Sequence, residues 1–287
     1  MSVATIDDTE LDGVFECAAG DERLPGVLAL GGSDGGIPTY FQRLLASERC
    51  ACLALAYHAT PKTQPALIEV PLERLERALR WLRAHPRVET RDGRIGVIGA
   101  SKGAELALVL ATTFPDLVGP VVAYTPSSVV WSGIDYRAAA PPLRSSWSWG
   151  GNPLAFVPVP SGVPPLHTER GLSFLPIYAR GLDGVESNAA AIIPIERATG
   201  PVLLISGADD RMWPAQRMCR MLVDRAQRFG RAHLVRHLDF AEAGHALFTV
   251  GPETELKSPL PVDFGGSELA TARAHASAWP EVLRLLL

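Results

Sequence analysis

The sequence predicts an α/β fold in which a mostly parallel sheet is covered by helices. Two observations support this prediction. Short, almost continuously apolar runs alternate with amphipathic helical patterns along the chain. The 287 residues are 47% hydrophobic and 20% charged, which is an ordinary globular balance and suits one large α/β domain. We therefore expect residues 1–287 to form a single domain.

Short apolar runs are expected to form the strands of this sheet. Strands that are covered by helices on both faces are apolar throughout, rather than alternating. The last run contains charged and polar residues, so we expect it near an edge of the sheet. The predicted strands are Gly26–Gly31, Ala51–Tyr57, Arg94–Gly99, Pro120–Tyr124, Pro201–Ser206 and His233–Asp239.

Three segments outside these runs have helical patterns with clear boundaries. Pro71 can open a helix, leucines at positions 72, 75, 79 and 82 mark one face, and Pro86 ends it. A second helix is expected between Pro214 and Gly230. A third is expected at residues 272–287, where Pro280 can kink the helix.

Composition and charge exclude several classes of protein. The net charge of −4 is not that of a general nucleic-acid binder. No apolar run approaches the ~18 residues that span a bilayer. The N-terminal residues are acidic and lack the apolar core that a signal peptide has. The four cysteines are too few and too scattered for a disulfide framework or a zinc site. We expect a cytoplasmic protein without a metal or cofactor.

The segment 127–194 interrupts the alternation of strands and helices. It is rich in proline and contains Trp131, Trp147 and Trp149. A long irregular segment inside a compact domain is usually functional or disordered, and three tryptophans argue against disorder. We expect this segment to form a cap over a pocket, with its tryptophans lining the pocket or packing in a core, and at least one of them in a core.

The sequence Gly99-Ala-Ser-Lys-Gly103 matches the pattern G-x-S-x-G between a predicted strand and a predicted helix over residues 105–114. This is the setting of a nucleophile elbow, in which a strained turn exposes a serine hydroxyl. The alternative is a tight turn whose glycines only permit close packing. We favour Ser101 as a nucleophile because suitable partners follow it in the chain.

A serine nucleophile needs a base and a carboxylate that orients the base, in the chain order Ser, Asp or Glu, His. Asp209 and Asp210 follow one predicted strand, and His245 follows the next in a loop that contains glycine. We assign His245 as the base and Asp210 as the orienting carboxylate, because Asp209 can instead cap the turn. The other six histidines lie in helices, strands or other loops.

A glycine-rich loop, Gly31-Gly-Ser-Asp-Gly-Gly36, follows the first apolar strand. Acyl transfer needs hydrogen-bond donors for the oxyanion of the transition state. The backbone N–H groups of Ser33 and Lys102 are expected to supply them. The alternatives are a flexible turn or a phosphate-binding loop, but the spacing matches neither G-x-G-x-x-G nor a Walker motif.

Beyond these residues, the sequence resembles the α/β-hydrolase domain of the acyl-CoA thioesterase and bile-acid-CoA:amino acid N-acyltransferase family. The resemblance runs from about residue 24 to the C-terminus. It is specific, because it includes the Pro-Lys-Thr and Ser-Lys-Gly segments and a late Gly-Gly…His-Ala…Trp pattern. The similar segments are residues 31–40, 54–63, 82–88, 99–106, 193–197, 207–213, 243–245 and 264–279.

The resemblance implies a Ser-His-Asp enzyme that attacks an acyl thioester and forms an acyl-enzyme, with Ser101, His245 and Asp210 in these roles. Family members with serine as the nucleophile tend toward hydrolysis, and members with cysteine tend toward transfer to an amine. The family's N-terminal β-sandwich domain is expected to be absent, since about 23 residues precede the hydrolase region. Residues 129–176 also differ from the equivalent family segment.

Several readings remain open at this point. The leading one is hydrolysis of an acyl thioester of CoA or of carrier-bound pantetheine. An acyltransferase, a cyclase or a carboxylester hydrolase would use the same triad. A non-catalytic scaffold protein with this fold would not use the triad. The Lys102 side chain is expected to face solvent or a CoA phosphate. The acyl chain and the oligomeric state are not predicted.

Overall fold

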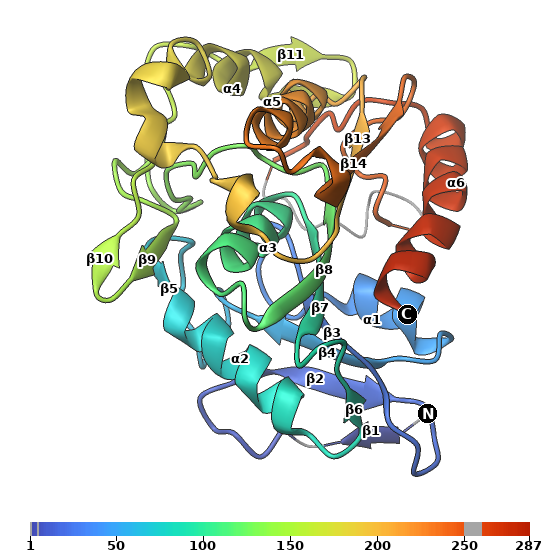
Figure 1. Cartoon of the computed structure of the whole chain (residues 1–287). Coiled ribbons are helices and arrows are strands. Elements are labelled where there is room, and N and C mark those ends of the chain that lie inside the picture. Colours follow the sequence, from blue (N-terminus) through green and yellow to red (C-terminus); the bar gives the residue numbers. More distant parts are fainter. Residues whose placement is uncertain (1, 5, 250–259) are drawn as a thin grey trace.

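The computed structural model describes residues 2–4, 6–249 and 260–287. Its centre is a nine-stranded sheet with helices on both faces, which confirms the predicted α/β fold (Figure 1). The strand order is β1-β2-β4-β3-β7-β8-β13-β14, and β6 pairs with β3 beside this path. The strands are β1 (Ser2–Ala4), β2 (Asp12–Cys17), β3 (Leu24–Leu30), β4 (Ala51–Ala56), β6 (Val88–Glu89), β7 (Ile95–Ala100), β8 (Val118–Tyr124), β13 (Val202–Gly207) and β14 (Val235–Phe240).

All strand pairs from β4 to β14 are parallel, whereas β1 and β2 add antiparallel pairs at one edge. The six predicted strands correspond to β3, β4, β7, β8, β13 and β14, and β14 lies at the opposite edge, as expected. Strand β2 was not predicted from the sequence. Only Phe15 and Cys17 of this strand are buried, so it lacks the continuous apolar run of a strand covered on both faces.

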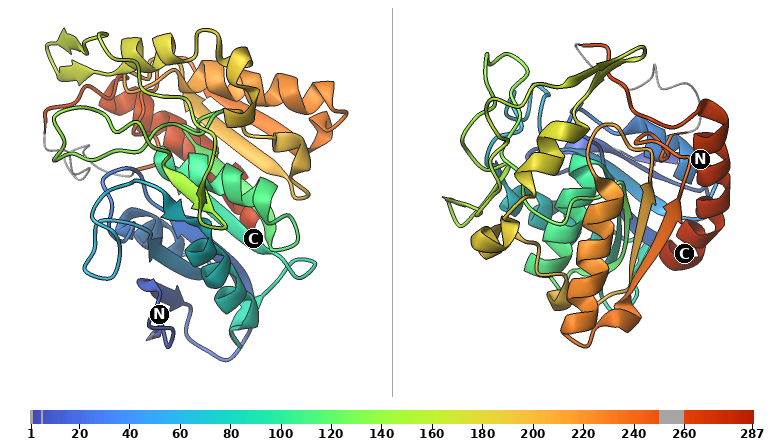
Figure 2. Two further views of the ribbon diagram at one scale, coloured as in Figure 1. Left: turned by 90° about the vertical axis from the view of Figure 1, so that its left-hand side faces the viewer. Right: turned by 90° about the horizontal axis from the view of Figure 1, so that it is seen from above.

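Helices cover the two faces of the sheet unequally (Figure 2). On one face lie α2 (Leu72–Ala84), α3 (Lys102–Thr113) and α5 (Ala215–Arg228), and on the other lie α1 (Thr39–Ala46) and α6 (Glu268–Leu286). Alternate residues of β3 point into the two cores: Leu28 and Leu30 into the first, Val27 and Ala29 into the second. The four predicted helices correspond to α2, α3, α5 and α6.

Residues 127–194 contain short elements only, and a further short helix, η2 (Ile195–Arg197), follows them. The elements within the segment are β9 (Trp147–Trp149), β10 (Asn152–Pro153), β11 (Leu166–Thr168), β12 (Gly171–Ser173), α4 (Leu175–Gly181) and η1 (Val185–Ala191). Strand β9 pairs with β5 (Val70–Pro71), which ties the segment to the start of α2. Trp147 is buried in the core beneath α2 and α3, Trp131 lies in a separate apolar cluster with Trp213, and Trp149 is 37% exposed.

Candidate active site

Ser101 occupies a sharp turn between β7 and α3, at the carboxyl ends of the parallel strands (Figure 1). Its φ of 54° and ψ of −119° lie in a region that residues with a side chain rarely adopt. The turn is held by backbone hydrogen bonds, because the Ser101 N–H donates to the carbonyl of Tyr124, and its carbonyl accepts from Ala104 and Glu105. The local structure is therefore that of a strained strand-to-helix turn.

The two glycines of the G-x-S-x-G motif are required by space. A Cβ atom on Gly99 would come within 3.0 Å of the backbone of Gly103, and a Cβ on Gly103 would collide with the carbonyl oxygens of Leu30 and Gly31. Because backbone atoms cannot move aside easily, only glycine allows α3 to start this close to β3 and β7. The motif thus brings the first turn of α3 against the glycine-rich loop.

Asp210 and His245 are brought together by two neighbouring loops. Asp210 follows β13, and His245 follows β14; their atoms Oδ2 and Nδ1 lie 2.8 Å apart, and both side chains are buried. The other oxygen of Asp210 accepts hydrogen bonds from the N–H groups of Met212 and Trp213, at 2.8 and 3.1 Å. With Nδ1 turned toward the carboxylate, Nε2 of His245 is the ring atom left for a proton transfer.

The neighbouring carboxylate, Asp209, has different partners. Its oxygens contact Nε of Arg211 at 2.8 Å and the N–H of Gly266 at 3.0 Å. Asp209 therefore anchors the segment around Gly265, which belongs to one of the segments that resemble the family. That segment also supports the histidine, because the His245 N–H donates to the carbonyl of Phe264 at 2.7 Å and the two rings stack.

The glycine-rich loop passes directly beside the serine. A Cβ placed on Gly32 would lie 3.6 Å from Cβ of Ser101. The buried Tyr57 hydroxyl lies 2.6 Å from the carbonyl of Gly31, and Oγ of Ser33 lies 2.9 Å from the hydroxyl of Tyr136. The N–H of Lys102 belongs to the first helical position, which has no acceptor within its helix. Both predicted oxyanion donors thus belong to segments that flank Ser101.

His58 is one of the six histidines that were assigned no role from the sequence. The structure buries it, at 3% exposure, with Nε2 3.4 Å from the Ser33 carbonyl. Burial lowers the pKa of His58 from 6.5 to about 4, so the ring is neutral at pH 7. Within the described part of the chain its Nδ1 has no hydrogen-bond partner. A histidine directly after a buried strand was the available signal.

The expectation for the Lys102 side chain was wrong. The side chain is buried at 2% exposure instead of facing solvent or a phosphate, and its Nζ lies 2.6 Å from Oε1 of the fully buried Glu105. The same Nζ lies over the ring of Trp147, 5.2 Å from its centroid. The reason is the helical spacing of three residues, which lets the two side chains meet on one face of α3. A lysine and a glutamate three residues apart were therefore the signal in the sequence for this ion pair.

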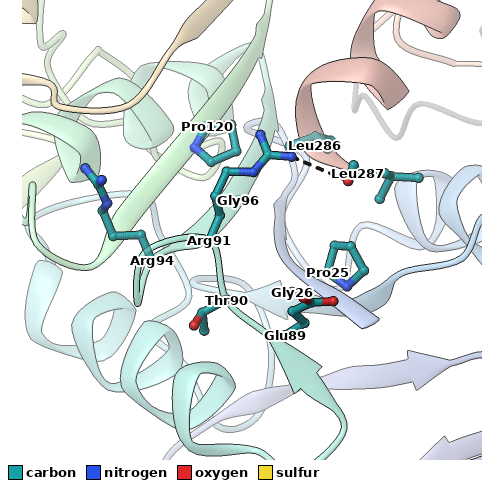
Figure 3. A pocket seen from close by; sticks show the side chains of 10 residues that line it. All are labelled: Pro25, Gly26, Glu89, Thr90, Arg91, Arg94, Gly96, Pro120, Leu286 and Leu287. Atoms are coloured by element: carbon teal, nitrogen blue, oxygen red, sulfur yellow. Dashed lines mark hydrogen bonds between the residues drawn. The ribbon is translucent and has the colours of Figure 1, made fainter. Parts of the chain in front are cut away.

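A cavity of about 250 Å³ lies elsewhere in the molecule, and Figure 3 shows the residues that line it. It is lined by the starts of β3, β7 and β8, by Arg91 and Arg94, and by the last residues of α6. It is therefore at the amino ends of the strands, whereas Ser101, Asp210 and His245 follow the carboxyl ends. Among the described residues no cluster of His, Cys, Asp and Glu side chains could hold a metal, and no helix is long and apolar enough to cross a membrane.

Known proteins are similar to this chain in sequence and in fold. Residues 70–286 match the family model described as BAAT / Acyl-CoA thioester hydrolase C terminal. The chain belongs to this family. It is 28% identical over 282 residues to acyl-coenzyme A amino acid N-acyltransferase 2 of Mus musculus, a match that covers 96% of this chain and 63% of that protein. It is 30% identical to acyl-coenzyme A thioesterase 6 of Mus musculus, and this match covers 92% of this chain and 59% of that protein.

This member of the family thus spans about 60% of the length of the curated relatives it matches. Solved structures show a similar fold. Thermogutta terrifontis esterase 2, phosphonylated by sarin, superimposes with a TM-score of 0.56 at 15% identity, covering 99% of this chain and 94% of that chain. The esterase domain from a Rhodothermus marinus protein superimposes with a TM-score of 0.53 at 14% identity, and the match covers 100% of this chain and 99% of that chain. The fold is that of the α/β hydrolases.

Proposed function

We propose that this protein is a serine hydrolase that cleaves an acyl thioester, with Ser101 as nucleophile, His245 as base and Asp210 as the orienting carboxylate. The observation that supports this most strongly is the buried hydrogen bond between His245 and Asp210 at the sheet edge where the strained turn presents Ser101. Membership of the acyl-CoA thioester hydrolase family supports the thioester as the bond attacked.

The proposed roles of these residues imply a two-step reaction. Nε2 of His245 takes the proton of the Ser101 hydroxyl as Oγ attacks the carbonyl carbon. The negative charge that develops on the carbonyl oxygen is held by the N–H groups of Ser33 and Lys102. The carbon–sulfur bond then breaks, the sulfur leaves with the proton from His245, and the acyl group stays on Oγ. Asp210 stabilises the imidazolium without taking its proton.

The second step returns the enzyme to its starting state. Water attacks the acyl-enzyme while His245 accepts its proton, and the carboxylic acid leaves as Ser101 regains its hydrogen. An amine that reaches the acyl-enzyme first would give an amide instead. We place this acyltransferase reaction second, because relatives named as amino acid N-acyltransferases are among the matches, while serine as the nucleophile favours hydrolysis within the family resemblance.

We propose the segment 127–194 as the cap of the active site. It supplies Tyr136, which reaches Ser33 of the glycine-rich loop, and Trp131, whose ring contacts Tyr178 in the aromatic series that continues through Trp213 to His245. Aromatic rings in this position would form an apolar wall for an acyl chain. The substrate proposed here is an acyl thioester of CoA or of carrier-bound pantetheine.

The test is intact-mass spectrometry of the protein after incubation with a panel of acyl-CoAs, beside Ser101→Ala. We expect an adduct of acyl mass on the wild type that is absent from the variant and decays to free acid. An adduct that persists in water but disappears on adding an amino acid would favour transfer. Labelling by a fluorophosphonate without any adduct from any acyl-CoA would contradict the acyl-CoA proposal.

A matched variant separates chemistry from folding. Ser128 is a buried serine outside the proposed triad, with its Oγ near Sδ of Met221. Ser128→Ala removes a hydroxyl of the same kind and should still form the adduct. Loss of the adduct in both variants would indicate a general structural effect rather than loss of the nucleophile.

A further inference from the structure

We propose that Lys102 and Glu105 form a positioning pair, which holds the Lys102 N–H in the direction that an oxyanion requires and ties it to the tryptophans of the segment 127–194. This inference rests on the proposed function, in which that N–H binds the oxyanion. It assigns the Lys102 side chain to the interior of the protein rather than to the substrate.

Glu105 contacts both Lys102 and the tryptophans of the segment 127–194. Its Oε1 lies 2.6 Å from Nζ of Lys102, 2.8 Å from Nε1 of Trp147 and 3.2 Å from the backbone N of Trp131. One carboxylate oxygen therefore joins the first turn of α3 to two points of the segment 127–194. Trp147 is held twice, because Nζ of Lys102 also lies over its ring.

These contacts restrain the Lys102 peptide next to Ser101. Lys102 directly follows Ser101, so its peptide N–H forms part of the strained turn. Its side chain is anchored at the far end by Glu105, one turn along the same helix. Such an anchor restricts rotation of the Lys102 peptide, and a displacement of about 1 Å at such a group can lower a rate ~100-fold. The pair is thus placed to control the direction of the N–H.

The stability of the fold by itself explains the buried ion pair of Lys102 and Glu105 poorly. Burial lowers the pKa of Lys102 and raises the pKa of Glu105, since taking both charges out of water is unfavourable; their mutual contact opposes both changes. Oε2 of Glu105 is buried without a hydrogen-bond partner among the described residues. A buried ion pair of this kind can often be exchanged for uncharged residues without loss of stability.

The experiment compares Lys102→Met, Glu105→Gln and the double variant with the wild type. In Glu105→Gln the amide oxygen can still accept the two tryptophan N–H groups. Each single variant leaves one buried charge unpaired and is expected to lower the thermal midpoint, whereas the double variant is expected to recover it. The rate of labelling of Ser101 by a fluorophosphonate and kcat for acyl-CoA hydrolysis are measured on all four proteins.

If the pair positions the N–H, the double variant recovers stability but not activity. We expect its labelling rate and kcat to stay about 10- to 100-fold below those of the wild type, with KM for acyl-CoA within about threefold. A double variant with full kcat would overturn the proposal. A rise in KM at unchanged kcat would also overturn it, because it would assign Lys102 to the binding of CoA.

The matched control is the ion pair of Arg225 and Glu196, with a nitrogen–oxygen distance of 2.6 Å, which joins the last turns of α5 to η2. Arg225→Met with Glu196→Gln removes a less buried pair, whose side chains are 22% and 15% exposed and which lies outside α3, and should leave both rates unchanged. A wild type that is labelled but inactive on every acyl-CoA would contradict the proposed function alone, since the labelling rates would still test the pair. A wild type without labelling would contradict both.

Discussion

Nδ1 of His245 lies 2.8 Å from Oδ2 of Asp210, whereas Asp209, the adjacent carboxylate in the chain, turns to Arg211 and Gly266. The two neighbours thus have different partners: Asp210 contacts an imidazole, and Asp209 contacts a loop. The difference arises because Oδ1 of Asp210 is also held by two backbone N–H groups of its own turn, which points the remaining oxygen at the histidine.

Asp210→Asn is expected to lower kcat for acyl-CoA hydrolysis by about 10³- to 10⁴-fold. The amide keeps the size of the side chain but removes the charge that, in the proposed mechanism, orients His245 and stabilises the imidazolium. Asp209→Asn is the matched control and is expected to reduce kcat less than about tenfold, because that residue acts on a loop. Steady-state kinetics of both variants test this, and a greater loss in Asp209→Asn would reverse the assignment.

Ser101→Gly is expected to be more stable than Ser101→Ala, by about 1 kcal/mol in the free energy of unfolding. At φ 54° and ψ −119° a Cβ atom is strained, and glycine relieves that strain. At the exposed Asp224 in α5, the reverse order is expected, with glycine about 1 kcal/mol less stable than alanine. Denaturant unfolding of the four variants measures both differences, and the same order at both sites would argue against strain at Ser101.

Gly103→Ala is expected to destabilise the fold by roughly 3 kcal/mol or more, because the new Cβ would collide with the backbone oxygens of Leu30 and Gly31. Gly230→Ala provides the comparison. Nothing lies within 4 Å of a Cβ there, but φ is +70°, so only backbone strain of about 1–2 kcal/mol is expected. Thermal and urea unfolding distinguish the two, and equal losses would mean that space at Gly103 is not limiting.

His58 is expected to make the protein less stable at acidic pH. Its pKa is lowered to about 4 in the folded state from 6.5, so between these values the unfolded chain binds more protons and stability falls as the pH falls. This destabilisation is absent above pH 6.5 and amounts to about 3 kcal/mol near pH 4. His58→Gln should lose that part of the pH dependence.

The measurement is the free energy of unfolding at pH 7 and pH 5 for the wild type and His58→Gln. Burial also lowers the pKa values of His237 and His275, so these residues contribute to the pH dependence of both proteins. The informative quantity is therefore the difference in pH dependence between the wild type and His58→Gln. Parallel dependences on pH in the two proteins would show that His58 does not titrate with a lowered pKa.

Much of the sheet could be predicted because its central strands are buried on both faces. Runs such as Ala51–Ala56 and Val202–Gly207 are buried at every position and are mostly apolar. The predicted helices are bounded by prolines and glycines. The edge strand β2 and helix α1 escaped prediction. Strand β2 has only two buried side chains, and α1 is eight residues long, so neither has a pattern that stands out from its surroundings.

The sequence by itself determined the order of the chemistry-bearing residues: a serine between two glycines after one strand, and an acidic pair and a histidine after two later strands. Parallel strands carry their following loops to one edge of the sheet, so this order already implies that the residues approach one another. The tertiary structure decided which carboxylate faces His245 and where the Lys102 side chain goes. Those outcomes depend on contacts between segments far apart in the chain, such as Gly265 against Asp209 and Trp147 against Lys102, which no local pattern encodes.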